Sequence, residues 1–379
     1  STSLTITANG TAANPIVVRA ATPGNVVWSG GQIIIKGTYV TLSGFTVTAQ
    51  QQDFLQVTDF GHDIRINDFT FQGAGDGSDG SSVGLIKIAG SPGWSWQPGP
   101  NFPGAPTILL NVLIDQSSFL QPRNTVLWVQ HGTTGVKFCH NEVVGPHGIT
   151  GGGETMALKF GFSSGFNENA QAYISFNTFR DWEGRPYLIG IKMGGVHMYG
   201  NLIARGRVEF RATSNSRFVG NVILDGDFQG GGANHVISKN YIRTINDRDG
   251  FGPFMLYNTT GWGVYQGDGN WFTVGMTNST IAGNTFFNSA TSTGFAVVMR
   301  HSQYEVQGPK ATGNTFMNNL FASDSTSVLG RCAMVIDNGW AADTANFKAT
   351  NSFVNNVEQC GTANTAPPTA IELSPADLI

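Results

Sequence analysis

Basic residues gather in one short segment of a chain that is acidic overall. Residues 180–217 hold seven bases against three acids, a local excess of four positive charges. The whole chain has a net charge of −4 and a pI near 5.9, so its bulk charge does not attract a polyanion. We therefore expect no nucleic-acid partner, and we expect an anionic ligand to bind at this segment. The bases are Arg180, Arg185, Lys192, Arg205, Arg207, Arg211 and Arg217, and the acids are Asp181, Glu183 and Glu209.

Two of these bases stand at nearly the same distance before a recurring asparagine. Lys192 lies nine residues before Asn201, and Arg211 lies ten residues before Asn221. If each Asn marks the same corner of successive coils, both cations occupy the same place on neighbouring strands, which lie ~4.8 Å apart. The spacing therefore predicts that a Lys and an Arg project side by side.

Alternation along the predicted strands decides which face carries these cations. Val208 and Phe210 share one face of their strand, whereas Arg207, Glu209 and Arg211 share the other. Because the apolar pair belongs in a core, the charged residues are predicted to lie on an outer sheet.

The preceding and following coils extend the same pattern. Ile189 and Ile191 oppose Lys192 on their strand. One coil after Arg211, at the place ten residues before Asn240, the run Gly230-Gly231-Gly232 predicts bare backbone with room for a polymer crossing the coils. The segment thus predicts a groove with a cationic floor, suited to an acidic polysaccharide.

A short phrase gives the period of the fold: Asn, one spacer, then Val, Ile or Phe. The gaps between successive asparagines are 36, 24, 20, 19, 44 and 30 residues, so three are near 20 and one is about twice that. A period this short indicates a solenoid. The phrase occurs at Asn141, Asn177, Asn201, Asn221, Asn240, Asn284 and Asn314.

The segments between these asparagines predict strands, because they are short, alternate apolar with polar residues, and are rich in β-branched and aromatic types. Residues 208–211, 235–238 and 296–299 are examples. The dense Leu pattern of leucine-rich repeats is missing. We therefore predict an all-β fold, a single right-handed parallel β-helix. Its Asn side chains stack at one corner, each amide bonding the next, in a turn where Asn tolerates left-handed backbone angles.

Composition and chain organisation agree with a solenoid. Fifty Gly in 379 residues suit a fold made of turns. A solenoid grows by adding coils, so we expect one β-helix domain over residues 1–360 and a tail or cap over residues 361–379. Cys332 and Cys360 could form a disulfide that pins the last coils.

The setting of the protein is also predicted. No apolar run approaches 18 residues, so we expect no membrane partner. A start at Ser1 without Met looks processed, which predicts a secreted protein, extracellular or periplasmic. We expect a monomer.

Several short motifs together resemble one enzyme family. The opening residues 10–18, 21–24 and 37–45 are followed by Ala157-Leu158-Lys159-Phe160-Gly161-Phe162, Ile191-Lys192, Tyr199-Gly200-Asn201, Phe210-Arg211, Gly230-Gly231-Gly232 and residues 253–258. In order and spacing, over roughly residues 5–320, this resembles polysaccharide lyase family 6, the alginate lyases and chondroitinase B-like enzymes. The resemblance implies a lyase acting on a 4-linked uronate polymer, alginate above all, by β-elimination.

The resemblance also assigns roles to the two cations in register. Lys192 matches the lysine that acts as Brønsted base, and Arg211 matches the arginine that acts as acid. β-Elimination removes the C5 proton of a uronate, and a lysine can take it only when neutral, a state that a nearby cation such as Arg211 favours.

The chain departs from the family at the calcium-binding positions. The family carries acidic residues seven and five positions before the lysine, where this chain has Arg185 and Tyr187. These do not suit calcium, so we predict no metal site and no cofactor. A guanidinium matches a carboxylate bidentately, so Arg185, with Arg205 or Arg207, is predicted to replace the ion. The family's His after the arginine is Ala212 here, and two residues are deleted between Asn201 and Arg211.

Other residues are predicted to contact substrate. Trp262 belongs to an aromatic patch that could stack on sugar rings, and Arg300, His301 and Tyr304 follow a strand several coils later and could hold distal uronates. Glu209 and Tyr187 complete the predicted binding residues.

Alternative functions remain open on the same fold. A non-catalytic solenoid that binds acidic polysaccharide accounts for the missing calcium ligands. A uronate epimerase performs the same proton abstraction, but its Asp-Pro-His-Asp phrase is absent and the nearest string is Gly145-Pro146-His147-Gly148. A glycoside hydrolase requires paired carboxylates, and the predicted outer face carries Lys and Arg instead.

Overall fold

The computed structural model describes most of the strands and many of the turns between them. It covers residues 3–58, 61–78, 84–89, 108–130, 132–146, 156–165, 169–182, 187–245, 252–257, 275–289, 297–300, 311–323, 334–336, 347 and 349–360. The chain forms two compact units, one of residues 1–97, 102–162 and 168–197, the other of residues 98–101, 163–167 and 198–379. The predicted tail, residues 361–379, and Cys332 lie outside the described residues.

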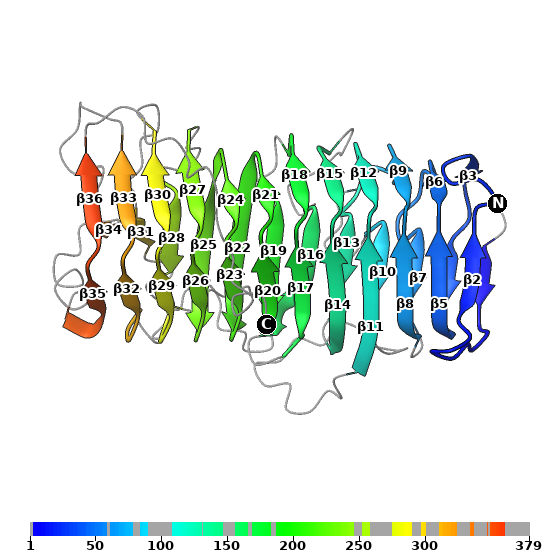
Figure 1. Cartoon of the computed structure of the whole chain (residues 1–379), viewed down its shortest axis with the longest axis horizontal. Helices are drawn as coiled ribbons and strands as arrows, with labels where there is room; N and C mark the ends of the chain where they lie inside the picture. Colours follow the sequence, from blue (N-terminus) through cyan, green and yellow to red (C-terminus); the bar gives the residue numbers. More distant parts are fainter. Residues whose placement is uncertain are drawn as a thin grey trace. The chain divides into compact units, whose positions relative to one another are not determined.

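In both units, short parallel strands stack into three sheets, A, B and C, and the chain visits them in the same order on every coil. The strand stacks can be followed within the first unit in Figure 1, for example from β2 through β5, β8 and β11 to β14. This is the predicted all-β parallel β-helix. No helix among the described residues is long and apolar enough to cross a membrane.

In the first unit the strands fall into the three sheets as follows. Sheet A contains β1 (Leu4–Ile6), β4 (Ile33–Ile35), β7 (Leu55–Val57), β10 (Ile86–Ile88), β13 (Leu127–Val129), β16 (Leu158–Gly165) and β19 (Ile189–Met193). Sheet B contains β2 (Ile16–Arg19), β5 (Thr38–Ser43), β8 (His62–Asn67), β11 (Ile108–Asp115), β14 (Thr133–Cys139), β17 (Ala172–Ser175) and β20 (Val196–Tyr199). Sheet C contains β3 (Val26–Trp28), β6 (Phe45–Val47), β9 (Thr70–Gln72), β12 (Ser118–Leu120), β15 (Glu142–Val144) and β18 (Thr178–Arg180). The unit boundary falls within β16 and β20.

In the second unit, sheet A contains β22 (Gly206–Ser214), β25 (Gly226–Ala233), β28 (Phe254–Tyr257), β31 (Val297–Arg300) and β34 (Met334–Ile336). Sheet B contains β23 (Arg217–Val219), β26 (Val236–Ser238), β29 (Thr280–Ala282), β32 (Thr315–Met317) and β35 (Ser352–Val354). Sheet C contains β21 (Leu202–Ile203), β24 (Val222–Ile223), β27 (Tyr241–Thr244), β30 (Thr285–Asn288), β33 (Leu320–Ser323) and β36 (Val357–Cys360).

The core is filled by apolar side chains that repeat once per coil. Phe71 stacks on Phe119 with ring centroids 4.7 Å apart, and Phe286 stacks on Phe321 at 5.5 Å. Because strand pairing puts equivalent side chains directly over one another, identical residue types form columns. This stacking explains the alternation read from the sequence.

A ladder of side-chain amides closes the corner between sheets B and C. In the second unit the backbone N–H of Asn221 donates to Oδ1 of Asn240 at 2.8 Å, and Nδ2 of Asn240 donates to Oδ1 of Asn284 at 2.8 Å. Nδ2 of Asn240 also donates to the carbonyl oxygen of Phe218 at 2.7 Å. Each amide therefore satisfies backbone groups on a neighbouring coil that would otherwise be buried without partners, which confirms the predicted Asn stacking.

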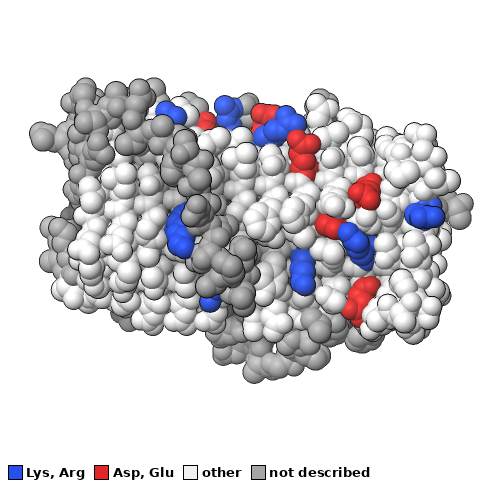
Figure 2. Space-filling view, in the orientation of Figure 1, with Lys and Arg blue, Asp and Glu red and all other residues white. Residues whose placement is uncertain are grey.

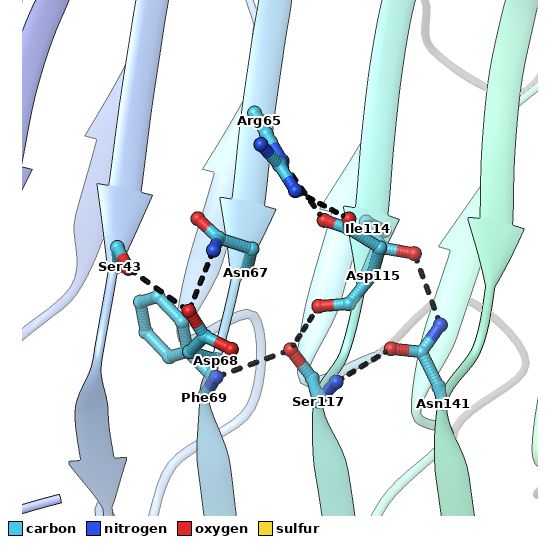
Figure 3. A network of polar contacts seen from close by, with 9 residues as sticks. All are labelled: Ser43, Arg65, Asn67, Asp68, Phe69, Ile114, Asp115, Ser117 and Asn141. Carbon is cyan, nitrogen blue, oxygen red and sulfur yellow. Dashed lines mark hydrogen bonds and ion pairs between the residues drawn. The ribbon is translucent and has the colours of Figure 1, made fainter. Parts of the chain in front are cut away.

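In the first unit the same ladder begins with a serine (Figure 3). Oγ of Ser117 accepts from the N–H of Phe69 at 3.2 Å, and the N–H of Ser117 donates to Oδ1 of Asn141 at 2.9 Å. Asn141 Nδ2 donates to the carbonyl oxygen of Ile114 at 2.9 Å. A hydroxyl can thus take the place of an amide at a rung, which is why the Asn phrase does not start earlier in the sequence.

One asparagine was assigned to the wrong corner. The neighbour of Asn284 in the ladder is Asn319, whose Oδ1 accepts from the N–H of Asn284 at 3.0 Å. Asn314 instead accepts from the N–H of Ser279 at 3.0 Å and belongs to a second ladder, between sheets A and B. The sequence reading failed because both corners of that coil carry an Asn, five residues apart.

The second ladder mixes residue types and therefore has no repeated phrase. Ser216 N–H donates to Nδ1 of His235 at 3.3 Å, His235 N–H donates to Oγ of Ser279 at 3.0 Å, and Asn314 N–H donates to Oδ1 of Asn351 at 2.8 Å. Hydroxyl, imidazole and amide groups can each accept this bond.

The left-handed residue of each turn is the one before the rung, not the rung itself. Gly200, Gly220 and Gly283 have φ of 59°, 63° and 63° and precede Asn201, Asn221 and Asn284. In the second ladder Asn215 and Asn234 have φ of 53° and 59° and precede Ser216 and His235. Gly and Asn tolerate this conformation best, which explains the Gly before many ladder asparagines and corrects the expectation that the ladder Asn adopts it.

His235 is the one rung of the described ladders that can titrate near neutral pH. Its ring is fully buried, and its Nδ1 accepts the Ser216 N–H, so the proton sits on Nε2, which donates to the carbonyl oxygen of Gly231 at 3.1 Å. Burial lowers the pKa of His235 from 6.5 to about 4. The folded protein therefore keeps this imidazole neutral at pH values where the unfolded chain protonates it.

We expect this rung to make the fold sensitive to acid. Because the folded pKa is depressed, the unfolded state binds more protons between pH 6.5 and 4, and stability falls as pH falls through that window, by about 3 kcal/mol. His235→Asn supplies an amide acceptor without a titrating group. Urea unfolding at pH 7.5 and 4.5 should show a loss in the wild type that is about 3 kcal/mol larger than in the variant; parallel losses would contradict this account.

Candidate active site

Lys192 lies in the first unit, in a strand whose five residues are all buried. Ile189 and Ile191 are 0% exposed and fill the core side of β19, as alternation predicted. Lys192 itself is only 1% exposed. The core side of β19 is therefore the predicted one. Lys192 itself is enclosed and does not lie on an open surface.

A second lysine of the first unit is buried in the same way. Lys159 in β16 is 1% exposed, and its neighbours Leu158 and Phe160 are 0% exposed and belong to the core. β16 and β19 are adjacent in sheet A, and the N–H of Leu158 donates to the carbonyl oxygen of Leu188. Two enclosed lysines therefore stand on adjacent strands of one sheet. In the sequence, Lys159 is recognisable only as part of the motif of residues 157–162.

The arginines of the second unit have carboxylate partners one coil away. Nε of Arg207 lies 2.7 Å from Oδ1 and 3.0 Å from Oδ2 of Asp227, and both side chains are nearly buried. Nε of Arg205 lies 3.3 Å from Oδ2 of Asp225, with Arg205 largely exposed. The local positive excess read from the sequence is thus offset by two aspartates that stand 20 residues after the two arginines. One coil length separates each pair, and this spacing was a signal that the sequence reading missed.

Arg211 is held by an acid of its own strand. Its Nε lies 2.8 Å and its terminal nitrogen 2.7 Å from Oε1 of Glu209, which is 0% exposed. The β22–β25 register shifts between Phe210 and Thr213, so Arg211 sits in a bulge. Bulges re-aim side chains, so this irregularity fixes the direction of the guanidinium together with Glu209.

The run Gly230-Gly231-Gly232 allows adjacent coils to pack closely, whereas the sequence predicted an open groove floor there, beside Arg211. Gly230 pairs with Phe210, not with Arg211, and a Cβ on it would collide with the Met276 side chain in the core. Gly232 has φ of +103°, and a Cβ there would collide with the backbone of Thr213. The prediction of bare outer backbone at position 230 was therefore wrong, because the bulge moves the register by one residue.

The structure describes only some of the remaining predicted site residues. Tyr187 is half-buried just before β19, and Arg300 ends β31, where only its backbone is described. Arg185, Trp262, His301 and Tyr304 lie outside the described residues. Lys192 belongs to the first unit, and Arg205, Arg207, Glu209 and Arg211 belong to the second.

The residues present do not fit a calcium ion of the kind that family 6 enzymes use. The two positions that would supply carboxylates hold Arg185 and Tyr187, and neither a guanidinium nor a neutral phenol is a suitable ligand for a hard cation. Among the described residues no group of three His, Cys, Asp or Glu side chains could hold a metal ion.

Charged side chains outside these strands are mixed in sign. On the face shown in Figure 2, most of the described surface is uncharged, and Lys or Arg side chains lie next to Asp or Glu in several places. Arg65 is one example: its Nη2 lies 2.7 Å from Oδ2 of Asp115 (Figure 3). Among the described residues on this face, such pairs therefore leave no broad surface of one sign to draw in a polyanion.

Comparison with solved structures places the fold among polysaccharide lyases. A mannuronic-acid-specific family 6 lyase from human gut microbiota has a TM-score of 0.66 at 17% identity, covering 97% of this chain and 80% of that one. The family 6 alginate lyase AlyGC has a TM-score of 0.67 at 14% identity, covering 96% of this chain but 48% of that one. The family 6 lyase Pedsa3628 from Pseudopedobacter saltans has a TM-score of 0.53 at 14% identity, covering 98% and 89%.

These likenesses show a shared fold. No protein-family model matches the chain, and no curated protein matches it by sequence. The resemblance noted from short motifs is thus supported at the level of architecture, over nearly the whole chain.

The two arginine pairs of the second unit should differ sharply in their contribution to stability. Arg207→Ala leaves Asp227 nearly buried without its cation, which should lower the free energy of unfolding by about 3 kcal/mol. Arg205→Ala removes an exposed guanidinium from Asp225, whose buried carboxylate keeps the hydrogen bond from the N–H of Ile245 to Oδ1 at 3.1 Å, so the loss should be about 1 kcal/mol or less. Chemical denaturation of both variants tests this, and equal losses would show that the difference in burial does not matter.

Proposed function

We propose that this protein is a polysaccharide lyase that cleaves a 4-linked uronate polymer, with alginate as the favoured substrate. The observation that carries the proposal is Lys192, enclosed on sheet A of a parallel β-helix with the fold of family 6 lyases. Burial works against the charged form of an amine, which is the direction that a general base requires.

The proposed reaction is a β-elimination. The neutral amine of Lys192 takes the C5 proton of a uronate, and the electron pair left on C5 is delocalised into the adjacent carboxylate. That pair then forms the C4=C5 double bond while the C4–O bond to the leaving sugar breaks. Arg211 donates a hydrogen bond that polarises the leaving oxygen, since an arginine itself rarely gives up a proton. The leaving oxygen takes its proton from water, and the hydroxide left behind takes the proton from the Lys192 ammonium, which restores the neutral amine. The products are an unsaturated uronate and a free 4-hydroxyl.

Charge neutralisation of the substrate carboxylate is assigned to side chains. Arg207 is engaged by Asp227 and nearly buried, so its positive charge is already compensated. Arg185, at a calcium-ligand position of the family, is the better candidate of the predicted set, and Lys159 adds a positive group on the strand next to Lys192 when it is protonated. Glu209 holds the Arg211 guanidinium in a fixed direction.

Proton abstraction also begins an epimerase reaction, and an inactive site would leave a binding protein. Release of an unsaturated uronate, which absorbs near 235 nm, separates the three, because an epimerase and a binding protein produce no double bond. We expect this absorbance with at least one member of a panel of polymannuronate, polyguluronate, dermatan and glucuronate polymers. The absence of absorbance with every member would overturn the lyase proposal.

Removing either proposed catalytic side chain should abolish most of the activity. Lys192→Ala and Arg211→Ala should each lower kcat by about 100-fold or more, since general acid–base groups contribute on that scale. Lys137→Ala is the matched control, because Lys137 is an exposed lysine of β14 in the first unit and should keep the wild-type rate. Wild-type rates in both site variants would show that the assignment is wrong.

The activity should not require calcium. Because Arg185 and Tyr187 stand where the family has acids, we expect full initial rates in excess EDTA, measured at 235 nm. Complete loss that added calcium restores would mean that a metal, and not a guanidinium, neutralises the substrate.

A further inference from the structure

A row of polar and aromatic side chains crosses the outer face of sheet A in the first unit. Gln56, Lys87, Trp128 and Lys159 pair directly with one another on β7, β10, β13 and β16. Their strand neighbours, such as Ile86 and Leu127, are 0% exposed and form the core. The row therefore lies on the outer side of the sheet, and β19 with Lys192 is the next strand along it.

Lys87, in the middle of this row, has a partly exposed side chain. Its Nζ lies 4.7 Å from the centroid of the Trp128 ring and 3.2 Å from Oδ2 of Asp53, and about a fifth of its side chain (21%) is exposed. A cation over an indole face is held without losing all its hydrogen-bond donors, because an ammonium has three. Lys87 thus keeps a donor for a ligand.

Asp53 is fixed before any ligand arrives. Its Oδ1 accepts the Gly84 N–H at 3.1 Å, and its own N–H donates to the carbonyl oxygen of Gly84 at 2.6 Å. Asp53 also has φ of 49°, a conformation that tertiary contacts must maintain. The position of the ammonium is therefore set by a rigid carboxylate on one side and a rigid ring on the other.

Trp128 carries a donor that is not used. The side chain is 5% exposed, and its indole Nε1 has no hydrogen-bond partner in the described part of the chain. The nitrogen is itself buried, so the part of Trp128 that acts on a ligand site is the ring face under the Lys87 ammonium.

The row also has the spacing that a polymer lying across the coils requires. Successive strands lie ~4.8 Å apart, close to the length of one 4-linked sugar residue, so the three steps from Lys87 to β19 span ~14 Å. A chain with one uronate at Lys192 reaches Lys87 only if it extends by about three further sugars.

We propose that Lys87, oriented by Trp128 and Asp53, forms a distal uronate-binding subsite three strands from Lys192. Its ammonium binds a sugar carboxylate, and the Trp128 ring holds that ammonium in place. This inference rests on the proposed lyase function for the identity of the polymer. Lys87 is a binding residue here, and Trp128 and Asp53 position it.

The test measures binding of oligomannuronates and oligoguluronates of three and eight residues by calorimetry, in the Lys192→Ala background so that nothing is consumed. Lys87→Gln should weaken the Kd for the octamer about tenfold and leave the trimer unchanged. Trp128→Leu removes the aromatic face under the ammonium and should weaken octamer binding about fivefold. Asp53→Asn keeps the acceptor for Gly84 and should strengthen octamer binding, since the ammonium loses its competing carboxylate.

The controls separate a subsite from a general effect. Lys137→Gln changes an exposed lysine of sheet B and should bind both oligomers as the parent does. Thermal melting within a few degrees of the parent shows that each variant is folded. Octamer binding unchanged by all three substitutions, or no binding of any oligomer, overturns the subsite. A further outcome is that octamer binding depends on Lys87 while the wild-type protein releases no unsaturated product. This outcome supports the subsite and contradicts the lyase proposal.

Discussion

The hydrogen bond from one coil's backbone N–H to the side-chain acceptor of the next is the interaction on which the rest of the structure depends. Every coil turns a corner where peptide groups are buried and cannot bond within their own strand. At the corner between sheets B and C, Asn240 accepts from Asn221, donates to Asn284 and donates to the carbonyl oxygen of Phe218. Because the rungs are buried and mutually dependent, each coil fixes the position of its neighbours.

The same stacking determines the electrostatics. Side chains one coil apart stand opposite each other, so Arg207 meets Asp227 and Arg205 meets Asp225. These two aspartates reduce the excess of positive charge in residues 180–217 from four to two. Binding or catalysis on such a sheet face depends on a few enclosed side chains with specific neighbours. It does not depend on a broad positive potential that attracts any anion.

The two buried lysines of the first unit are enclosed side chains of this kind. Lys159 and Lys192 are each 1% exposed on adjacent strands of sheet A. The outer row of the same sheet continues through Trp128 to Lys87, whose ammonium is held between a ring and a carboxylate. The proposed base and the proposed distal contact thus share one sheet, whose spacing suits a polymer laid across the coils.

The sequence by itself determined the architecture and the faces of the strands. The Asn phrase and the alternation of Val208 with Glu209 are local patterns, and local patterns are sufficient to predict strands, corners and which side chains enter the core. They could not show that Asn314 serves a different corner from Asn284, that His235 takes a rung, or that Gly230 faces Met276. Coils differ in length and β22 contains a bulge, so equal spacing along the chain does not guarantee equal position in space. Only the backbone hydrogen-bond register of the folded coils decided which side chains meet, and with it the partners of Arg207, Arg211 and Lys87.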